Sequence, residues 1–559
     1  MMKIRIVILL LFVILGACRN QKISEKTKGP SRCNPIDLSY RFCLDEPSRR
    51  EAADPTVVWF ADRYFLFASK SGGYWHSADL TQWDFIETDE IPVEEYAPTA
   101  IALGDTLYFL ASSNERSTLY QSTDPLAGKW KVAREALETP VWDPAFFLDD
   151  DGRLYLYWGC SNVRPIYGVE VDYRNHFSFI GKPTELIHAR PEHYGWEVPG
   201  DENTLIHQNP WIEGAWMNKH NGNYYLQYAG PGTEYKSYSD GVYVSAQPLG
   251  PYVLQEHNPF AAKAGGFACG AGHGSTFADR YGNFWHIGTV TISVKHLFER
   301  RLALYPTFFD EEGILYADTR FGDYPMLIPQ KKVQGFDDLF PGWMLLSYQK
   351  EVETSSSVDS LPPSFMTDED IRTYWSAQSG QSGEWAIIDL GSSCDVFAIQ
   401  INFAEHQTSL FDLQKEKYHR YTLETSSDRV HWEMLADRSN NQNDRTHPYL
   451  QLPEKVNCRY LKINNIEVPD GTFAVSGFRV FGKGNASLPK AVTRLQLTRN
   501  TTDRRSIHLA WDKKEHATGY LIRYGAKKEN RYLSHMVYSD TSLTINNLNS
   551  ELSYYFSVD

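Results

Sequence analysis

A hairpin unit that occurs five times in the first half of the chain limits the fold more than any other feature. In its clearest copy, residues 141–159, a carboxylate beside a proline leads into an apolar strand, an Asp-Gly turn and an aromatic strand. Two apolar runs that flank an Asp-Gly turn are typical of a β-hairpin. The other copies lie at residues 53–69, 96–112, 212–230 and 272–289.

Repeats of this size, separated by further strand-like segments, are typical of propeller blades. We therefore expect an all-β chain that begins with a five-bladed β-propeller over residues 32–330. A propeller would bring the leading residues of the repeats to one end of a central channel. Three carboxylates and a histidine there predict a hydrolytic site. The leading residues are Asp54, Pro98, Asp143, Glu213 and His273.

The 559 residues are too many for one ordinary core, and two to four domains are expected. After residues 331–341 the composition changes, and strand-like alternation resumes over residues 343–484. Its series of motifs resembles a discoidin or coagulation-factor type C domain. That resemblance implies a jelly-roll β-sandwich that acts either as a carbohydrate-binding module or as a structural spacer.

A last segment, residues 489–559, contains the strand-like runs 506–525 and 543–559. These runs resemble a fibronectin type III domain, an immunoglobulin-like β-sandwich of about seven strands. We expect a truncated sandwich, because the sequence stops where the last strand should follow.

The N-terminus has the plan of a secretory signal, with Lys3 and Arg5 before an apolar run that is too short to span a bilayer. The run ends in LGAC, which resembles the lipobox of bacterial lipoproteins. The resemblance implies that residues 1–18 are a signal with a lipidated Cys18 and that residues 19–31 form a tether. We expect an exported bacterial lipoprotein held at a membrane, periplasmic or on the cell surface; an ordinary cleaved signal is the alternative.

A formal charge of -15 argues against nucleic acid or an anionic membrane surface as a partner. No cysteine spacing suggests zinc. In an oxidising compartment the first two exported cysteines could pair, two others are expected as free thiols, and the last two are left open. In that order they are Cys33 and Cys43, Cys160 and Cys269, and Cys394 and Cys458.

Three carboxylates suit hydrolysis of a glycosidic bond with inversion. One carboxylic acid protonates the leaving oxygen and one carboxylate activates water. These two carboxyl groups lie about 6.5–9.5 Å apart. A third raises the pKa of the acid. The segments AADPTVV (52–58), WDPAFF (142–147) and IEGAW (212–216) resemble the signature segments of glycoside hydrolase family 43, whose fold is a five-bladed propeller and whose mechanism is inverting. The resemblance implies Asp54 as general base, Asp143 as pKa modulator and Glu213 as general acid.

Aromatic faces and polar side chains hold sugars. Tryptophans near the site segments are candidates, with Trp142 favoured and packing between blades as the alternative for each. The resemblance implies a substrate contact for Arg301 and a calcium or sodium ion held near His273 through water, although a buried structural histidine fits equally. No cofactor is needed for the chemistry, and His207 and His286 are expected to be structural. The other tryptophan candidates are Trp75, Trp211 and Trp216.

The resemblance implies an enzyme acting on plant-type poly- or oligosaccharide, an α-L-arabinofuranosidase or a β-xylosidase, with galactan- or arabinan-cleaving activity as alternatives. The sucrose- and fructan-cleaving propellers need asparagine where Ala53 stands, which disfavours them. From another class, a non-catalytic glycan-binding lipoprotein remains an alternative. Oligomeric state is left open.

Overall fold

The computed structural model describes residues 29–92, 96–115, 117–411 and 417–559. Regular structure in these ranges is almost entirely β-strand. None of the helices in the described part of the chain is long and apolar enough to cross a membrane. The 3-10 helices are η1 (Pro125–Ala127), η2 (Gly195–Glu197), η3 (Phe336–Asp338) and η4 (Pro363–Met366).

Five four-stranded antiparallel sheets occupy the first part of the chain, and each contains one of the predicted hairpins. Sheet 1 is β4 (Thr56–Phe60), β5 (Arg63–Phe67), β6 (Gly73–Ser77) and β7 (Asp84–Glu87). Sheet 2 is β8 (Thr99–Leu103), β9 (Thr106–Leu110), β10 (Leu119–Asp124) and β11 (Lys129–Arg134). Sheet 3 is β12 (Ala145–Leu148), β13 (Leu154–Trp158), β14 (Ile166–Asp172) and β15 (Ser178–Ile187). Sheet 4 is β16 (Glu213–His220), β17 (Asn223–Gly230), β18 (Ser239–Ser245) and β19 (Val253–Leu254). Sheet 5 is β20 (Gly272–Ala278), β21 (Phe284–Thr291), β22 (Arg300–Phe309) and β23 (Leu315–Ala317).

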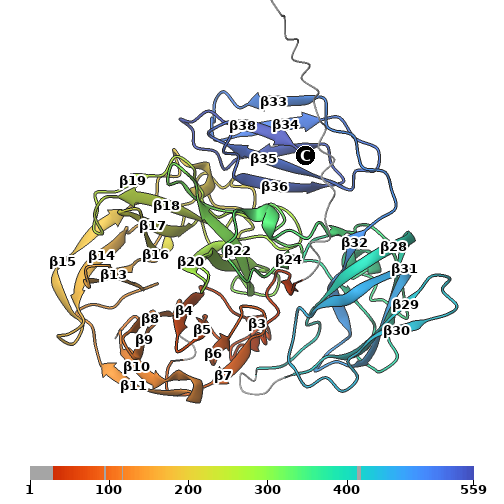
Figure 1. The fold of residues 1–559 in the computed structure, drawn as a ribbon, viewed down its shortest axis with the longest axis horizontal. Coiled ribbons are helices and arrows are strands. Elements are labelled where there is room, and N and C mark those ends of the chain that lie inside the picture. Colours follow the sequence, from red (N-terminus) through yellow and green to blue (C-terminus); the bar gives the residue numbers. More distant parts are fainter. Residues whose placement is uncertain (1–28, 93–95, 116, 412–416) are drawn as a thin grey trace, which may run out of the picture.

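The first strands of the five sheets contact one another in a closed ring, β4 to β8, β12, β16, β20 and back to β4 (Figure 1). The aromatic second strands supply much of the apolar core, and β13 is buried along its whole length. Five apolar clusters each lie between two neighbouring sheets, including one that joins sheet 5 to sheet 1. Burial of these side chains between sheets is the main force that holds the ring closed. We call this unit the five-sheet domain.

Short strands before and after the ring complete this domain. β1 (Ser31–Arg32) pairs with β24 (Met326–Leu327), so Ser31, at the end of the predicted tether, lies in a strand. β2 (Arg41–Phe42) pairs with β3 (Arg50–Glu51). β3 also contacts β22, which places it against the inner part of sheet 5.

The middle domain is one sheet system around a large apolar core, and the C-terminal domain holds two three-stranded sheets that share a second core. The middle domain contains β25 (Met344–Leu345), β26 (Glu351–Thr354), β27 (Trp375–Ser376), β28 (Trp385–Phe403), β29 (Arg420–Ser426), β30 (Glu433–Asp437), β31 (Tyr449–Glu467) and β32 (Ala474–Lys483). The C-terminal sheets are β33 (Leu495–Arg499), β34 (Ile507–Trp511) and β37 (Ser542–Ile545), and β36 (Leu533–Tyr538), β35 (Gly519–Gly525) and β38 (Tyr555–Val558).

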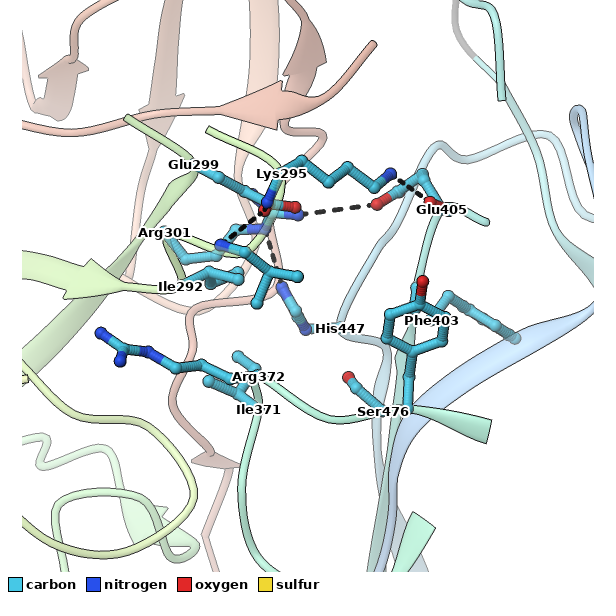
Figure 2. A pocket seen from close by; sticks show the side chains of 13 residues that line it. Ile292, Lys295, Glu299, Arg301, Ile371, Arg372, Phe403, Glu405, His447 and Ser476 are labelled. Carbon is cyan, nitrogen blue, oxygen red and sulfur yellow. Dashed lines mark hydrogen bonds and ion pairs between the residues drawn. The ribbon is translucent and has the colours of Figure 1, made fainter. Parts of the chain in front are cut away.

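The middle domain is joined to the five-sheet domain by buried charged groups and one histidine, which we call the domain junction: Arg50, Arg301, Glu405, Asp444 and His447. Arg50 donates to Glu405 and Asp444, at 2.8 and 2.9 Å. Arg301 donates to Nε2 of His447, at 3.1 Å, as Figure 2 shows. The two domains therefore share one ionic network.

The C-terminal domain also contacts the five-sheet domain. Tyr532 stacks on Tyr316 with ring centroids 3.6 Å apart, and Arg505 donates to the carbonyl oxygen of Pro191. In Figure 1 this domain lies beside sheets 4 and 5.

All six cysteines in the described residues are free thiols. The pair considered for Cys33 and Cys43 is not formed, because each thiol has other neighbours. Cys33 donates to the carbonyl oxygen of Asp323, whereas Cys43 donates to Glu51. Cys394 and Cys458 lie directly opposite each other on β28 and β31. Cys18 lies outside the described residues.

Candidate active site

The leading residues of the sheets have an uncommon backbone conformation. Asp54, Asp143 and His273 have positive φ angles of 54°, 51° and 45°. The equivalent residue of the second repeat is Ala97, with φ 47°, and not the predicted Pro98. Residues other than glycine rarely adopt this conformation, which costs free energy and is concentrated at functional sites. In sheet 4 the residue with a positive φ is Gly214, at 64°, so Glu213 stands one residue earlier than Asp54 and Asp143 do in their sheets.

A cavity of about 840 Å³ lies at this end of the ring. We call it the catalytic pocket. The structure brings together Asp54, Asp143, Glu213 and His273 in its wall, as the sequence predicted. Its other lining residues are Tyr96, Trp142, Cys160, Ser161, Val163, Arg164, Trp211, Gly232, Thr233, Glu234, Leu297, Phe298 and Arg300.

Asp54 is buried and each of its carboxylate oxygens accepts a hydrogen bond. Ser69 Oγ donates to Oδ2 at 2.7 Å, and Arg300 donates to Oδ1 at 3.1 Å. Arg300 also pairs with the buried Glu51, at 2.6 Å. One guanidinium therefore pairs with two buried carboxylates.

Asp143 holds a proton more tightly than an ordinary aspartate. Burial raises the pKa of Asp143 to about 7; the charge of His273 opposes the rise, and the carboxylates of Glu213 and Asp54 add to it. Ser112 Oγ donates to Asp143 Oδ1 at 3.2 Å. The carboxylate cluster is thus able to keep one proton near neutral pH.

Glu213 accepts two hydrogen bonds within the pocket. Tyr238 donates its hydroxyl to Oε1 at 2.5 Å, and the Cys160 thiol donates to Oε2 at 3.2 Å. Burial, with the nearby Asp143 and Glu213 charges, raises the pKa of the Cys160 thiol, which therefore stays protonated as a donor. Both contacts fix the direction of the Glu213 side chain.

Equivalent positions after the second strands of sheets 1, 2 and 3 link each sheet to the next. Ser69 Oγ accepts from the backbone N–H of Ala97 at 2.7 Å, and Ser112 Oγ accepts from that of Asp143 at 2.9 Å. Cys160 occupies the same place in sheet 3 and reaches Glu213. The sequence carried a sign of this link, because two repeats end in Ala-Ser, at residues 68–69 and 111–112.

His273 lies between two carboxylates. Its Nδ1 is 3.3 Å from Asp54 and 3.6 Å from Asp143. Burial lowers the pKa of His273, but the Asp54 and Asp143 charges outweigh burial and the net pKa is raised. Asp240 accepts the backbone N–H groups of His273 and Gly274, at 2.7 and 3.0 Å, and so holds the turn in place.

The carboxyl groups of the catalytic pocket are of the type that binds a hard cation. Calcium prefers six to eight oxygen ligands. The one group of three close side-chain donors found among the described residues is Asp143, Cys160 and Glu213, which includes a thiol and leaves out His273. These side chains do not form a calcium cage, and no step of the chemistry below uses an ion.

The predicted sugar contacts divide into two groups. Trp142 and Trp211 line the catalytic pocket, and 43% of Trp211 is exposed. Trp75 is fully buried in the core between sheets 5 and 1, where its indole donates to Ser39, so it does not reach the pocket. Trp216 lies outside the pocket lining, because its indole donates to the carbonyl oxygen of Thr276 in the neighbouring strand.

Arg301 is a correction to the sequence prediction. It belongs to the domain junction, and the arginine of the pocket is its neighbour Arg300. Adjacent residues of a strand point to opposite sides, so a shift of one residue changes the assignment. His286 is buried and bonded to the carbonyl oxygen of Ala271, in line with a structural role, and His207 is exposed outside the pocket.

Comparisons with known proteins agree with this geometry. The model for "Glycosyl hydrolases family 43" matches residues 48–315, a little under half of the chain, and the model for "F5/8 type C domain" matches residues 351–475. A search of curated proteins gives no match.

Among solved structures, one described as "Glycoside hydrolase" is 18% identical, with a TM-score of 0.46, over 79% of this chain and 99% of its own. A xylan β-1,4-xylosidase from Bacillus halodurans C-125 is 14% identical, with a TM-score of 0.41, over 94% and 96%. An α-L-arabinofuranosidase from Lactobacillus brevis is 18% identical, with a TM-score of 0.38, over 51% and 95%. Similarity at this level does not indicate the substrate of this protein.

The family models thus assign both larger domains. Residues 48–315 form a family 43 glycosyl hydrolase domain and residues 351–475 an F5/8 type C domain, and the protein is a glycoside hydrolase.

Proposed function

We propose that the five-sheet domain is a five-bladed β-propeller that hydrolyses a plant-type poly- or oligosaccharide with inversion, as an α-L-arabinofuranosidase or a β-xylosidase. The observation that carries this proposal is the meeting of three carboxylates, from the starts of three different sheets, in one pocket. An inverting enzyme needs an acid, a base and space for water between the base and the sugar.

In the proposed mechanism Asp54 is the general base. Arg300 and Ser69 hold its carboxylate in position through hydrogen bonds. Asp54 would take a proton from the water that attacks the anomeric carbon. His273, at 3.3 Å, helps to fix the position of this carboxylate.

Glu213 is the proposed general acid and Asp143 its modulator. The nearest donor atoms of these two carboxyl groups lie within 4.8 Å of each other. Like charges at this separation oppose ionisation of both groups, so one of the two carboxyl groups keeps its proton while the other is ionised. Tyr238 and Cys160 orient Glu213 toward the glycosidic oxygen.

We further propose that the protein is an exported lipoprotein anchored through Cys18 and that the C-terminal sheets form a fibronectin type III-like sandwich. The order of the N-terminal charges, apolar run and LGAC supports the first proposal, and two facing three-stranded sheets support the second.

Hydrolysis of nitrophenyl α-L-arabinofuranoside, β-D-xyloside and β-D-galactoside by protein lacking residues 1–18 tests the activity. We expect release from the first or second substrate and loss of turnover in Asp54→Ala. Glu213→Ala should lower the rate of hydrolysis more for substrates with poor leaving groups than for nitrophenyl glycosides, because nitrophenol needs little protonation to leave. Proton NMR of the first product formed checks inversion. Equal activity of Asp54→Ala and wild type would overturn the assignment of the base.

A further inference from the structure

A second cavity of about 340 Å³ adjoins the catalytic pocket, and we call it the side pocket. The two cavities share Trp142, Cys160, Ser161 and Arg164 in their walls, so a ligand can extend from one into the other. The remaining lining residues of the side pocket are Thr139, Pro140, Trp158, Gly159, Pro165, Tyr167 and Pro183.

Sheet 3 and the turn before it build the whole side pocket. Its wall is largely aromatic and proline: Trp158 stacks on Tyr167 with ring centroids 5.8 Å apart, and Trp142 is half-buried at the boundary between the two cavities. Flat apolar walls of this kind pack against the C–H faces of a sugar ring.

The two cavities differ in whether carboxyl groups line them. The catalytic pocket is lined by four carboxyl groups, together with the guanidinium groups of Arg164 and Arg300. The four carboxyl groups are those of Asp54, Asp143, Glu213 and Glu234. The side pocket has no carboxyl group among its lining residues, and its one charged side chain is Arg164. An acidic group on a substrate therefore meets like charges in the first cavity, whereas in the second it faces Arg164 with no carboxyl group in the wall.

Arg164 is held in place by its backbone. Its N–H donates to Ser161 Oγ at 2.9 Å, and the following Pro165 is buried and restricts the backbone of Arg164. In the part of the chain that the structure describes, its guanidinium has no ion pair or hydrogen bond with another side chain. An exposed, unpaired guanidinium beside an apolar wall is suited to bind a planar carboxylate with two hydrogen bonds.

We propose that the side pocket binds a uronic acid residue of the polysaccharide, with its carboxylate on Arg164 and its ring against Trp142. The proposal rests on the glycosidase function above and narrows its substrate to acidic, uronate-bearing chains. The neutral sugar that is removed occupies the catalytic pocket, and the uronate lies on the remainder of the substrate.

The test uses a matched pair of oligosaccharides: glucuronate-bearing xylo-oligosaccharides, and the same material after chemical reduction of its carboxyl group to an alcohol. Affinities are measured calorimetrically on Glu213→Gln protein, which binds without turnover. We expect the acidic form to bind about two- to fivefold more tightly, the scale of an exposed ion pair. Added salt should shrink the ratio.

Arg164→Gln, made in the same background, should bring the ratio of the two affinities to about one. Arg174→Gln is the matched control, because Arg174 is an exposed arginine of the same sheet that lines neither cavity. Equal affinities in the unsubstituted background, or an unchanged ratio in Arg164→Gln, would overturn the proposal.

Failure of the glycosidase proposal would look different. Wild-type protein would then release no sugar from any glycoside, while the ratio of affinities would still decide whether the side pocket recognises a carboxylate.

Discussion

Arg300 and Arg301 are neighbours on β22, yet they belong to two different charged regions of the molecule. Arg300 lies in the catalytic pocket, beside Asp54 and Glu51. Arg301 lies in the domain junction, beside His447 and Glu405. Both side chains are about 2% exposed, so burial alone does not distinguish them.

The two regions differ in what their charges face. At the domain junction Arg301, Glu405 and His447 lie close together (Figure 2). The cavity that these three residues help to line is only about 30 Å³. In the catalytic pocket the carboxylates face about 840 Å³ of open space. The comparison teaches that charges satisfied by other protein charges hold domains together, whereas charges that face space are available to a substrate.

The largest effect is expected for Arg301→Gln. Loss of the guanidinium leaves Glu405 with one cation fewer and His447 without its donor, and removing one partner of a buried pair costs about 3–5 kcal/mol. We expect this loss in the free energy of unfolding, measured with urea. The kcat of the protein that remains folded should change little. A large loss of kcat with unchanged stability would show that the junction acts on catalysis directly.

Arg300→Gln should give the reverse pattern. Without the cation beside Asp54, we expect kcat/KM to fall by about 10²–10³-fold, the effect of removing one fixed electrostatic contact in a site. The measurement uses protein shown to be folded by its thermal transition, because Glu51 also loses its partner. Arg300→Lys keeps the positive charge but loses the planar guanidinium that can donate to two carboxylates at once. It serves as the control and should recover part of the activity. Normal kcat/KM in Arg300→Gln would remove Arg300 from the site.

Asp143→Asn tests the proton held in the pocket. Because the raised pKa of Asp143, about 7, reflects a carboxyl cluster that keeps a proton, wild-type kcat/KM should fall as the pH rises through about 7. Removing one negative charge makes the remaining acid lose its proton more easily. The alkaline limb of the pH profile should therefore move to lower pH, by about one unit. An alkaline limb that stays in place would mean that Asp143 does not modulate the acid.

The smallest effect is expected for Cys160→Ala. This change removes one hydrogen bond to Glu213, which is worth about 0.5–1.5 kcal/mol, or about two- to tenfold in kcat/KM. Cys160→Ser keeps a donor at the same place and should retain most of the activity. Cys269→Ser is the control, since Cys269 is buried outside the catalytic pocket. A loss in Cys160→Ser equal to that in Cys160→Ala would argue against the hydrogen bond.

Local patterns predicted the elements well. Period-2 alternation around tight turns marked the five hairpins. The carboxylates were found for the same reason, because each stands at the start of a repeat, although Glu213 lies one residue before the position that Asp54 and Asp143 occupy. Trp75 and Trp216 were chosen because they are close in sequence to a site segment, and neither lines the pocket. Closeness in sequence does not say to which side of a strand a side chain points.

The sequence by itself determined that the chain is β-rich and repetitive and that Asp54, Asp143 and Glu213 each stand at the start of a repeat, because strand periodicity and turn chemistry are local properties. Only the tertiary structure decided that Arg300 rather than Arg301 faces Asp54, that Cys160 reaches Glu213, and that the middle domain completes the surroundings of β22. These choices depend on strand register and on contacts between residues far apart in the chain, where a shift of one residue exchanges the two faces of a strand.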